Sequence, residues 1–165
     1  MSKNFILEYI DKIEKKEIIV SNKIRKVYLK LLPIVKGEDP VWYYNEKKGS
    51  KVIKFVENFC KQSKGEWAGH PIKLMLFQKA KLQVIFGIVN RETNLRKYQE
   101  VFDVRARKNG KSVENSAIAL YLLVMDKEKG AEIYSAATVK EQAKRVWEES
   151  KNMIMQDVDL QKLLN

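Results

Sequence analysis

A chain of 165 residues and 19.3 kDa can bury a domain-sized core, and 45% hydrophobic content is typical of a folded protein. No apolar run approaches the roughly 20 residues that a bilayer-spanning helix needs, so we expect a cytoplasmic protein that does not enter a membrane. One cysteine and one histidine exclude an internal disulfide and a zinc site built from those two residue types. Cys60 sits beside apolar helical positions, so we expect a buried structural thiol.

The formal charge of +11 is distributed unevenly along the chain. Residues 61–112 hold 12 basic and 4 acidic side chains, whereas residues 113–165 are slightly acidic. A polyanionic partner, either a nucleotide or DNA, accounts for this concentration of cations. A lysine-rich solvated surface is the alternative, and for the N-terminal third it is at least as good an interpretation.

The N-terminal part of the chain predicts a small helical region followed by one further helix. Apolar residues recur at three- and four-residue spacing over residues 3–17, 21–35, 51–62 and 75–89. A break is expected at 37–40, and Ser50 can cap the third helix. A loop at residues 65–71 leads to the fourth helix.

The C-terminal part alternates strand and helix patterns. Residues 98–104 and 131–138 are rich in β-branched and aromatic side chains, which is typical of strands. Helical spacing follows each of them, over 113–124 and about 139–155. Strand, helix, strand, helix predicts parallel strands with crossover helices, whose ligands bind at the carboxyl ends of the strands.

Between the first strand and its helix lies the sequence Arg-Ala-Arg-Lys-Asn-Gly-Lys-Ser, residues 105–112. It carries the Gly-Lys-Ser end of a phosphate-binding loop (P-loop, Walker A), with Arg105 where the first glycine usually stands. The turn Asn109–Lys111 can supply backbone N–H groups, Lys111 a cation for the outer phosphates, and Ser112 a hydroxyl for Mg²⁺. The alternative is a basic turn with a serine near a helix start.

The charges around this loop favour the functional interpretation. Arg105, Arg107, Lys108 and Lys111 place four cations beside a helix N-terminus, which is already the positive end of the helix dipole. Such an arrangement is unfavourable unless an anion offsets it. Upstream, Gln78 follows Phe77 where the fourth helix starts. Several motor ATPases recognise adenine through a glutamine ahead of the phosphate loop, although an exposed helical glutamine is the simpler alternative.

The acidic residues after the loop predict no second metal motif. Glu148 and Glu149 fall on a helix, where glutamates usually form a solvated face, and Asp157-Val158-Asp159 lies in a short polar tail without a preceding strand. Glu114 places a carboxyl in the first turn of the loop helix, where a smaller or apolar residue is expected.

Taken together, these features resemble the N-terminal part of the large terminase subunit of tailed bacteriophages, the ATP-driven motor that packages DNA. The resemblance runs from about Ile19 to Ile154. Its carriers are residues 55–60, 65–69, 76–78, 85–87, 106–112, 117–123, 130–138 and 142–143.

The resemblance implies an α/β fold: a small helical N-terminal region, residues 1–62, and the first half of a P-loop ATPase domain, residues 63–165. The elements of this domain would follow the order strand, loop, helix, strand, helix, and its strands would be parallel. Intact members continue with an apolar strand ending Asp-Glu, a coupling motif and a nuclease domain, so we expect this chain to be truncated. It would then bind ATP and Mg²⁺ weakly without turning over.

The resemblance also implies roles and partners. Gln78 would read adenine, and Lys111 and Arg107 would be the catalytic cations. The residues expected to bind phosphate are Lys108, Asn109, Gly110, Lys111 and Ser112, with Ser112 also on Mg²⁺. Double-stranded DNA, the terminase small subunit, the portal and further copies of the chain would be partners. A non-enzymatic basic DNA-binding module and a fragment of a helicase-like ATPase remain alternatives.

Overall fold

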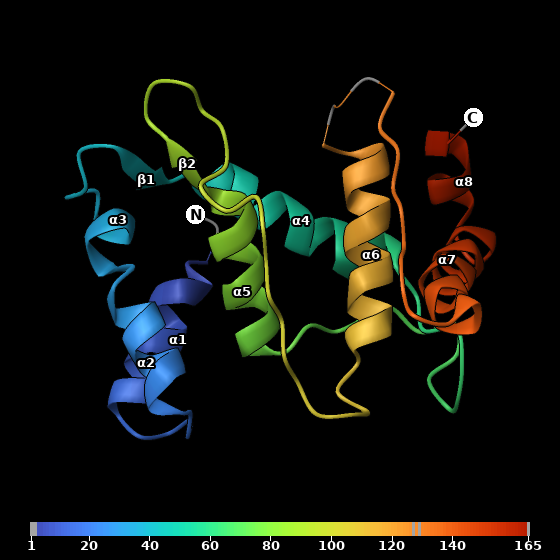
Figure 1. Ribbon diagram of the computed structural model, residues 1–165, viewed down its shortest axis with the longest axis horizontal. Helices are drawn as coiled ribbons and strands as arrows, with labels where there is room; N and C mark the ends of the chain where they lie inside the picture. The colour runs from blue at the N-terminus through green and yellow to red at the C-terminus, as the bar shows by residue number, and fades with distance from the viewer. Residues whose placement is uncertain (1–2, 127, 129, 165) are drawn as a thin grey trace. The chain divides into compact units, whose positions relative to one another are not determined.

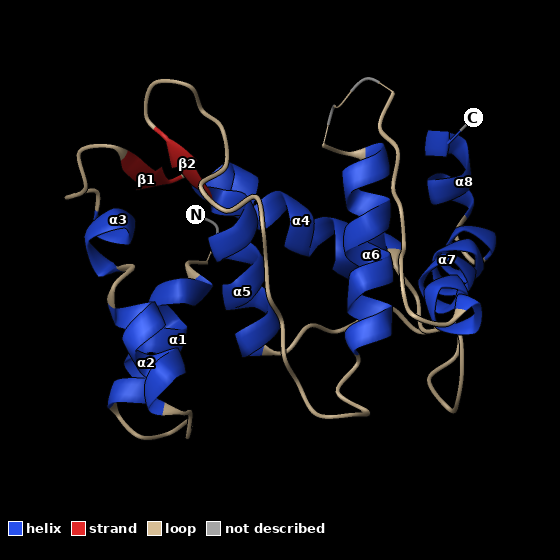
Figure 2. Cartoon of the chain, viewed as in Figure 1, coloured by secondary structure: helices blue, strands red, loops and turns tan. Residues whose placement is uncertain are grey.

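The computed structural model describes residues 3–126, 128 and 130–164, and most of its regular structure is helical (Figures 1 and 2). Two compact units divide the chain. Met1–Ile53 and Leu74–Phe102 form the first unit, and Lys54–Lys73 and Asp103–Asn165 form the second. The boundary falls inside helix α4 (Glu46–Phe59). The expected domain division at residue 62 stays a prediction.

The first unit is a group of helices with one small sheet. Besides the start of α4, it contains α1 (Phe5–Glu14), α2 (Asn22–Leu29), α3 (Leu32–Lys36), β1 (Trp42–Tyr44), α5 (Leu76–Gly87) and β2 (Ile88–Asn90). Helix α1 packs against both α2 and α5. Its core consists of Ile6, Tyr9, Ile10, Ile13, Tyr28, Leu31, Ile34, Ala80 and Ile88. The apolar spacing read from the sequence therefore identified the buried face of α1.

A proline divides the helix that we expected over residues 21–35. Helix α2 ends at Leu29 and α3 begins at Leu32, with Pro33 in its first turn. Proline has no N–H to donate and disfavours helical backbone in the preceding residue, but it fits the first turn of a new helix. Helix α4 also differs from expectation, because it starts at Glu46, and Asn45 Oδ1 accepts the Lys48 N–H at 3.1 Å near its start. Ser50 thus lies inside the helix and does not cap it.

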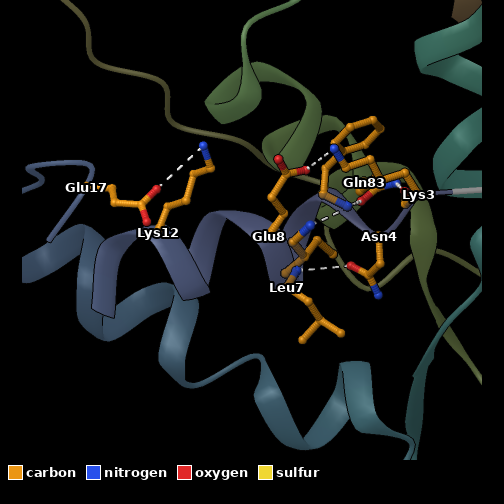
Figure 3. Close-up of polar contacts among 9 residues, drawn as sticks. Lys3, Asn4, Leu7, Glu8, Lys12, Glu17 and Gln83 are labelled. Carbon is orange, nitrogen blue, oxygen red and sulfur yellow. Dashed lines mark hydrogen bonds and ion pairs between the residues drawn. The ribbon is translucent and has the colours of Figure 1, made fainter. Parts of the chain in front are cut away.

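The start of α1 is held by a buried glutamine of α5 (Figure 3). Gln83 Oε1 accepts the N–H groups of Phe5 at 2.7 Å and Ile6 at 3.2 Å, and its Nε2 donates to the Lys3 carbonyl at 2.9 Å. The Asn4 side chain accepts the Leu7 N–H at 3.1 Å. These bonds satisfy N–H groups that an α-helix cannot satisfy internally.

Strands β1 and β2 form a two-stranded antiparallel sheet, with Tyr43 opposite Val89. Figure 2 shows both strands in red. Helix α5 gives way to β2 at Gly87, where a β-carbon would lie 2.6 Å from Cε2 of Tyr44. A residue without a side chain is therefore required where the Tyr44 ring crosses the end of α5.

The second unit is built on three helices and the end of α4. These helices are α6 (Lys111–Val124), α7 (Lys140–Met155) and α8 (Val158–Leu164). Helix α6 packs on α7, and α7 packs on α8. The buried residues of this unit include Phe55, Cys60, Ala117, Leu120, Tyr121, Met153 and Leu160. Phe55 and Tyr121 meet edge to face at 5.6 Å, and the expected burial of Cys60 is confirmed.

The structure differs from the sequence prediction at the two expected strands. Residues 98–104 and 131–138 are not strands, and among the described residues the only sheet is the antiparallel pair β1–β2. A strand needs a neighbour to satisfy its backbone, and neither stretch has one here. Their large side chains remain accessible, with Phe102 95% and Tyr134 84% exposed. Parallel pairing of these stretches stays a prediction.

The expected polar tail is also different, since residues 158–164 form α8. Within the part of the chain that the structure describes, no helix combines the length and apolar character of a membrane crossing.

Candidate phosphate-binding site

The candidate site lies at the N-terminus of α6. Gly110 directly precedes this helix with a φ of +66°, and its carbonyl accepts the Glu114 N–H at 2.9 Å. Among the described residues, no side chain caps this helix end. Nothing lies within 4 Å of the position that a β-carbon on Gly110 would take, so the space in front of it is open. The free N–H groups of a first helical turn and an open approach suit an anion.

The turn before the helix adds to this concave shape. Lys108 has a φ of +65°, Gly110 a φ of +66°, and Asn109 between them is not among the residues with positive φ. Left-handed residues alternating with ordinary ones turn successive N–H groups toward one side, which makes an anion-binding concavity. The side chains of Arg107 and Lys108 are exposed beside it, and so is Ser112. The structure therefore brings the expected loop residues together at one helix end.

Lys111 points back across the loop. Its Nζ donates to the carbonyl of Arg105 at 2.7 Å, and the residue is partly buried. This bond holds the ammonium group against the loop backbone, close to the N-terminus of α6. To bind a phosphate, the ammonium must exchange the carbonyl for a phosphate oxygen, which is a stronger acceptor because it is charged.

Sequence reasoning missed the partner of Arg105. Arg105 Nη1 lies 2.7 Å from Glu114 Oε2, and its Nη2 lies 3.0 Å from Asp103 Oδ2. The Glu114 side chain is 2% exposed and that of Arg105 11% exposed. Glu114 is therefore a buried, ion-paired carboxylate at a position where a smaller or apolar residue was expected. Two features of the sequence could have indicated this pair. One is a glutamate in the first turn of an apolar helix, and the other is an arginine at the position where phosphate loops usually have their first glycine.

Gln78, the expected adenine-reading residue, belongs to the first unit. It occupies the first turn of α5, where its Oε1 accepts the Met75 N–H at 2.8 Å. The side chain thus contributes to the start of the helix, a role that a glutamine three residues after the cap commonly takes.

Two of the acidic residues after the loop are structural. Glu149 is 7% exposed and its Oε1 accepts the Ser63 hydroxyl at 2.6 Å, so it does not belong to a solvated face. Asp157 Oδ1 accepts the Leu160 N–H at 3.0 Å, and its Oδ2 lies 3.0 Å from Lys61 Nζ. Burial acts to raise the pKa of Asp157, but the Leu160 N–H and the Lys61 ammonium outweigh it and hold that pKa below its usual value.

Cys60 lies near this aspartate. Burial, and to a lesser degree the Asp157 charge, raise the pKa of the thiol to about 12. A thiol with such a pKa stays protonated and is a poor nucleophile. Cys60 is therefore a packing residue.

The donor set at α6 fits the triphosphate of a nucleotide with its magnesium ion. Helix N–H groups, one lysine, one exposed hydroxyl and two exposed cations are the groups that such a ligand requires. Among the described residues, no group of three or more His, Cys, Asp or Glu side chains could hold a metal by itself. A magnesium ion here would be held by the Ser112 hydroxyl together with the nucleotide phosphates, since Mg²⁺ commonly has few protein ligands in such sites.

Comparison with known proteins identifies a protein family. Residues 76–164 match the family model of the terminase large subunit, ATPase domain, which is more than half of the chain. No curated protein and no solved structure matches. The matched range includes α5, the loop and all three helices of the second unit.

Proposed function

We propose that loop 105–112 binds ATP·Mg²⁺ as part of a DNA-packaging motor, because this chain belongs to the terminase large subunit family. One observation supports this most strongly. Gly110, Lys111 and Ser112 open α6, with no side chain capping its N-terminus among the described residues. The proposed chain consists of a helical region joined to an ATPase domain.

Each loop residue has a role that its chemistry allows. The N–H groups of Asn109, Gly110 and Lys111 would donate hydrogen bonds to phosphate oxygens, and the Lys111 ammonium would bind the outer phosphates. The Ser112 hydroxyl would be a ligand of the magnesium ion, which would supply positive charge to stabilise the phosphates. Arg107 or Lys108 would offset the negative charge that builds up during phosphoryl transfer.

Adenine recognition is assigned to Gln78. Its side-chain amide can both donate and accept, which matches the paired donor and acceptor on the adenine edge. Substituting Gln78 by Ala should reduce the preference for ATP over GTP while leaving triphosphate binding in place. A competition assay with both nucleotides measures this preference. An unchanged preference in a folded variant would remove Gln78 from the site.

The expected parallel sheet is part of the same proposal. Residues 98–104 and 131–138 would pair with each other or with neighbouring strands, in the arrangement that places ligands at carboxyl ends. Both stretches are rich in β-branched and aromatic side chains, which favour strands, and this supports the proposal.

We expect residues 1–165 alone to bind ATP without hydrolysing it at a measurable rate. Phosphoryl transfer to water needs a carboxylate or amide that orients the attacking water. The buried carboxylates described after the loop are already bound, Glu114 to Arg105, Glu149 to Ser63 and Asp157 to Lys61. A release of phosphate above the background rate would contradict this.

The partners follow from the family and from charge. Double-stranded DNA suits a chain with a formal charge of +11, and its binding should weaken steeply with salt. The terminase small subunit, the portal and other copies of the chain would complete the motor, in the cytoplasm of the host cell. A basic DNA-binding module without a nucleotide site is the alternative, and the loop variants below separate the two.

Calorimetric titration of the whole chain with ATP and Mg²⁺ tests the nucleotide site. The substitution Lys111→Met should weaken binding by roughly tenfold or more, because it removes a charge-assisted contact to phosphate. Lys144→Met is the matched control, since Lys144 is an exposed lysine of α7 paired with Glu148. Equal ATP affinity in wild type and Lys111→Met, or DNA binding alone, would favour the DNA-binding module.

A further inference from the structure

Arg105 stands where phosphate-binding loops of the usual pattern have their first glycine. Among the described residues, the non-glycine residues with positive φ are Lys16, Asn94 and Lys108, so Arg105 has ordinary backbone. Nothing in the backbone therefore calls for glycine at this position. The residue can carry a side chain, and that side chain is 11% exposed.

The Arg105 side chain joins three parts of the loop. Its Nη2 lies 3.0 Å from Asp103, before the loop, and its Nη1 donates to the Asn109 carbonyl at 3.3 Å, inside the turn. The same Nη1 lies 2.7 Å from Glu114 Oε2, in the first turns of α6. The Arg105 carbonyl accepts the Lys111 ammonium at 2.7 Å. A single residue thus holds the entrance, the turn and the helix of the loop together.

Glu114 needs this arginine. A carboxylate that is 2% exposed has lost most of its hydration, and burying a charge is costly unless an opposite charge and hydrogen bonds replace the water. Glu114 also lies in the first turn of the helix whose N-terminus would receive the phosphates. Without a cation beside it, its negative charge would repel that ligand.

We propose that Arg105 and Glu114 form a positioning pair that holds the phosphate loop in its binding shape and neutralises the Glu114 charge. This inference rests on the proposed nucleotide site for its effect on binding, but not for its effect on the loop itself. Arg105 acts through Glu114 and the loop backbone, without touching the nucleotide, and Glu114 is not a catalytic base.

A double-mutant comparison tests whether Arg105 acts through Glu114. Arg105→Met removes the guanidinium that lies 2.7 Å from the Glu114 carboxylate and its bond to the loop backbone, so ATP·Mg²⁺ affinity should fall by roughly tenfold to a hundredfold. Adding Glu114→Gln removes that charge, so affinity should recover in part, while the missing Arg105 contacts to Asp103 and the Asn109 carbonyl keep it below wild type. If the double variant binds as weakly as Arg105→Met, the Glu114 charge does not matter for binding, and the proposal that Arg105 neutralises it is overturned.

Amide hydrogen exchange without nucleotide provides the independent measurement. Glu114→Gln keeps the size of the side chain and should fold even if Arg105→Met does not. Loss of the ion pair should speed exchange of the amides of residues 106–112, whereas Glu148→Gln, in the exposed Lys144 pair of α7, should leave them unchanged. Unchanged loop exchange in folded Glu114→Gln would overturn the inference.

The two proposals can fail separately. If wild type does not bind ATP but Glu114→Gln loosens the loop, the positioning pair stands and the nucleotide site falls. If wild type binds ATP through Lys111 and the pair variants change neither the loop nor the affinity, the nucleotide site stands and the positioning pair falls.

Discussion

Two residues of the loop before α6 have a left-handed backbone conformation, and one of them is glycine whereas the other carries a side chain. Gly110 adopts a φ of +66° at no steric cost, whereas Lys108 adopts a φ of +65° with a β-carbon that this conformation disfavours. The space beside Gly110 is open, so a methyl group there would meet no neighbour, and only the backbone would be strained.

Substitutions at these two residues should therefore have opposite effects on stability. Gly110→Ala should lower the free energy of unfolding by about 1–2 kcal/mol, and Lys108→Gly should raise it by up to about 1 kcal/mol. Urea unfolding followed by circular dichroism measures both. Ala106→Gly, in the same loop but with ordinary φ, is the control and should not stabilise. A destabilising Lys108→Gly would show that its side chain contributes more than its backbone costs.

Asp157 provides a pH-dependent contribution. Its pKa is lower in the folded chain than the ordinary value of 3.8, so the unfolded chain binds the proton more readily. The stabilisation is therefore fully present above pH 3.8 and is lost as the pH falls through the lower folded pKa.

Asp157→Asn keeps an oxygen for the Leu160 N–H but removes the charge that faces Lys61. We expect the free energy of unfolding to fall by about 1 kcal/mol at pH 7, with the difference from wild type shrinking below pH 3.8. Urea unfolding at several pH values measures this. Asp159→Asn is the control, because Asp159 is 73% exposed and pairs loosely with Lys162. A difference that persists unchanged at low pH would contradict the assignment to charge.

At the scale of elements, one buried side chain connects two helices of the first unit. Gln83 of α5 accepts two N–H groups at the start of α1 and donates to the carbonyl of Lys3 (Figure 3). The helical pattern of the sequence placed Gln83 on α5, but a polar residue on an otherwise apolar face gave no indication of its partner. Its 77-residue separation from Ile6 explains why, since local patterns carry no information on such a contact.

Replacing Gln83 should cost more than replacing the α1 cap. Gln83→Leu leaves the N–H groups of Phe5 and Ile6 buried without an acceptor, so we expect a loss of about 2–3 kcal/mol of unfolding free energy. Asn4→Ala removes one exposed cap bond and should cost about 1 kcal/mol. Thermal and urea unfolding compare the two variants. A Gln83→Leu loss no larger than that of Asn4→Ala would show that water replaces the glutamine.

The helices and the strands were predicted with unequal success. Five of the six expected helices appear as single helices, and the one over 21–35 is divided into two, because an amphipathic face is a local property that packing then stabilises. The break at Pro33 was within reach of the sequence, since proline restricts the residue before it. The strands expected over 98–104 and 131–138 were not, because β-structure depends on a neighbour that no local pattern supplies.

At the scale of the whole molecule, these extended stretches expose apolar side chains. Phe102 is 95% exposed and Tyr134 is 84% exposed, in stretches rich in β-formers. Unpaired extended segments of this kind favour association between chains.

The double substitution Phe102→Lys and Tyr134→Lys should reduce association and raise solubility. Its effect on the free energy of unfolding should stay within about 0.5 kcal/mol, because both side chains are exposed. Sedimentation velocity over a range of concentrations measures association. Met155→Lys, an exposed apolar residue of helix α7, is the control and should have little effect. Equal association by wild type and the double variant would show that these stretches do not drive it.

The sequence by itself determined most of the helices and the family, and it indicated the loop as a candidate site. Gly-Lys-Ser between an extended stretch and an amphipathic helix is a short, local pattern, and the match over residues 76–164 confirms the resemblance that it suggested. Local spacing, glycine conformation and charge are written in neighbouring residues, so they can be read without the fold.

Only the tertiary structure decided which polar residues are buried and what they bind. Glu114, Glu149 and Asp157 look alike in the sequence, yet the structure pairs them with Arg105, Ser63 and Lys61 respectively. The reason is that a carboxylate can be buried only where its fold provides a donor or a cation. Such partners come from other turns and other elements, and packing alone brings them into contact.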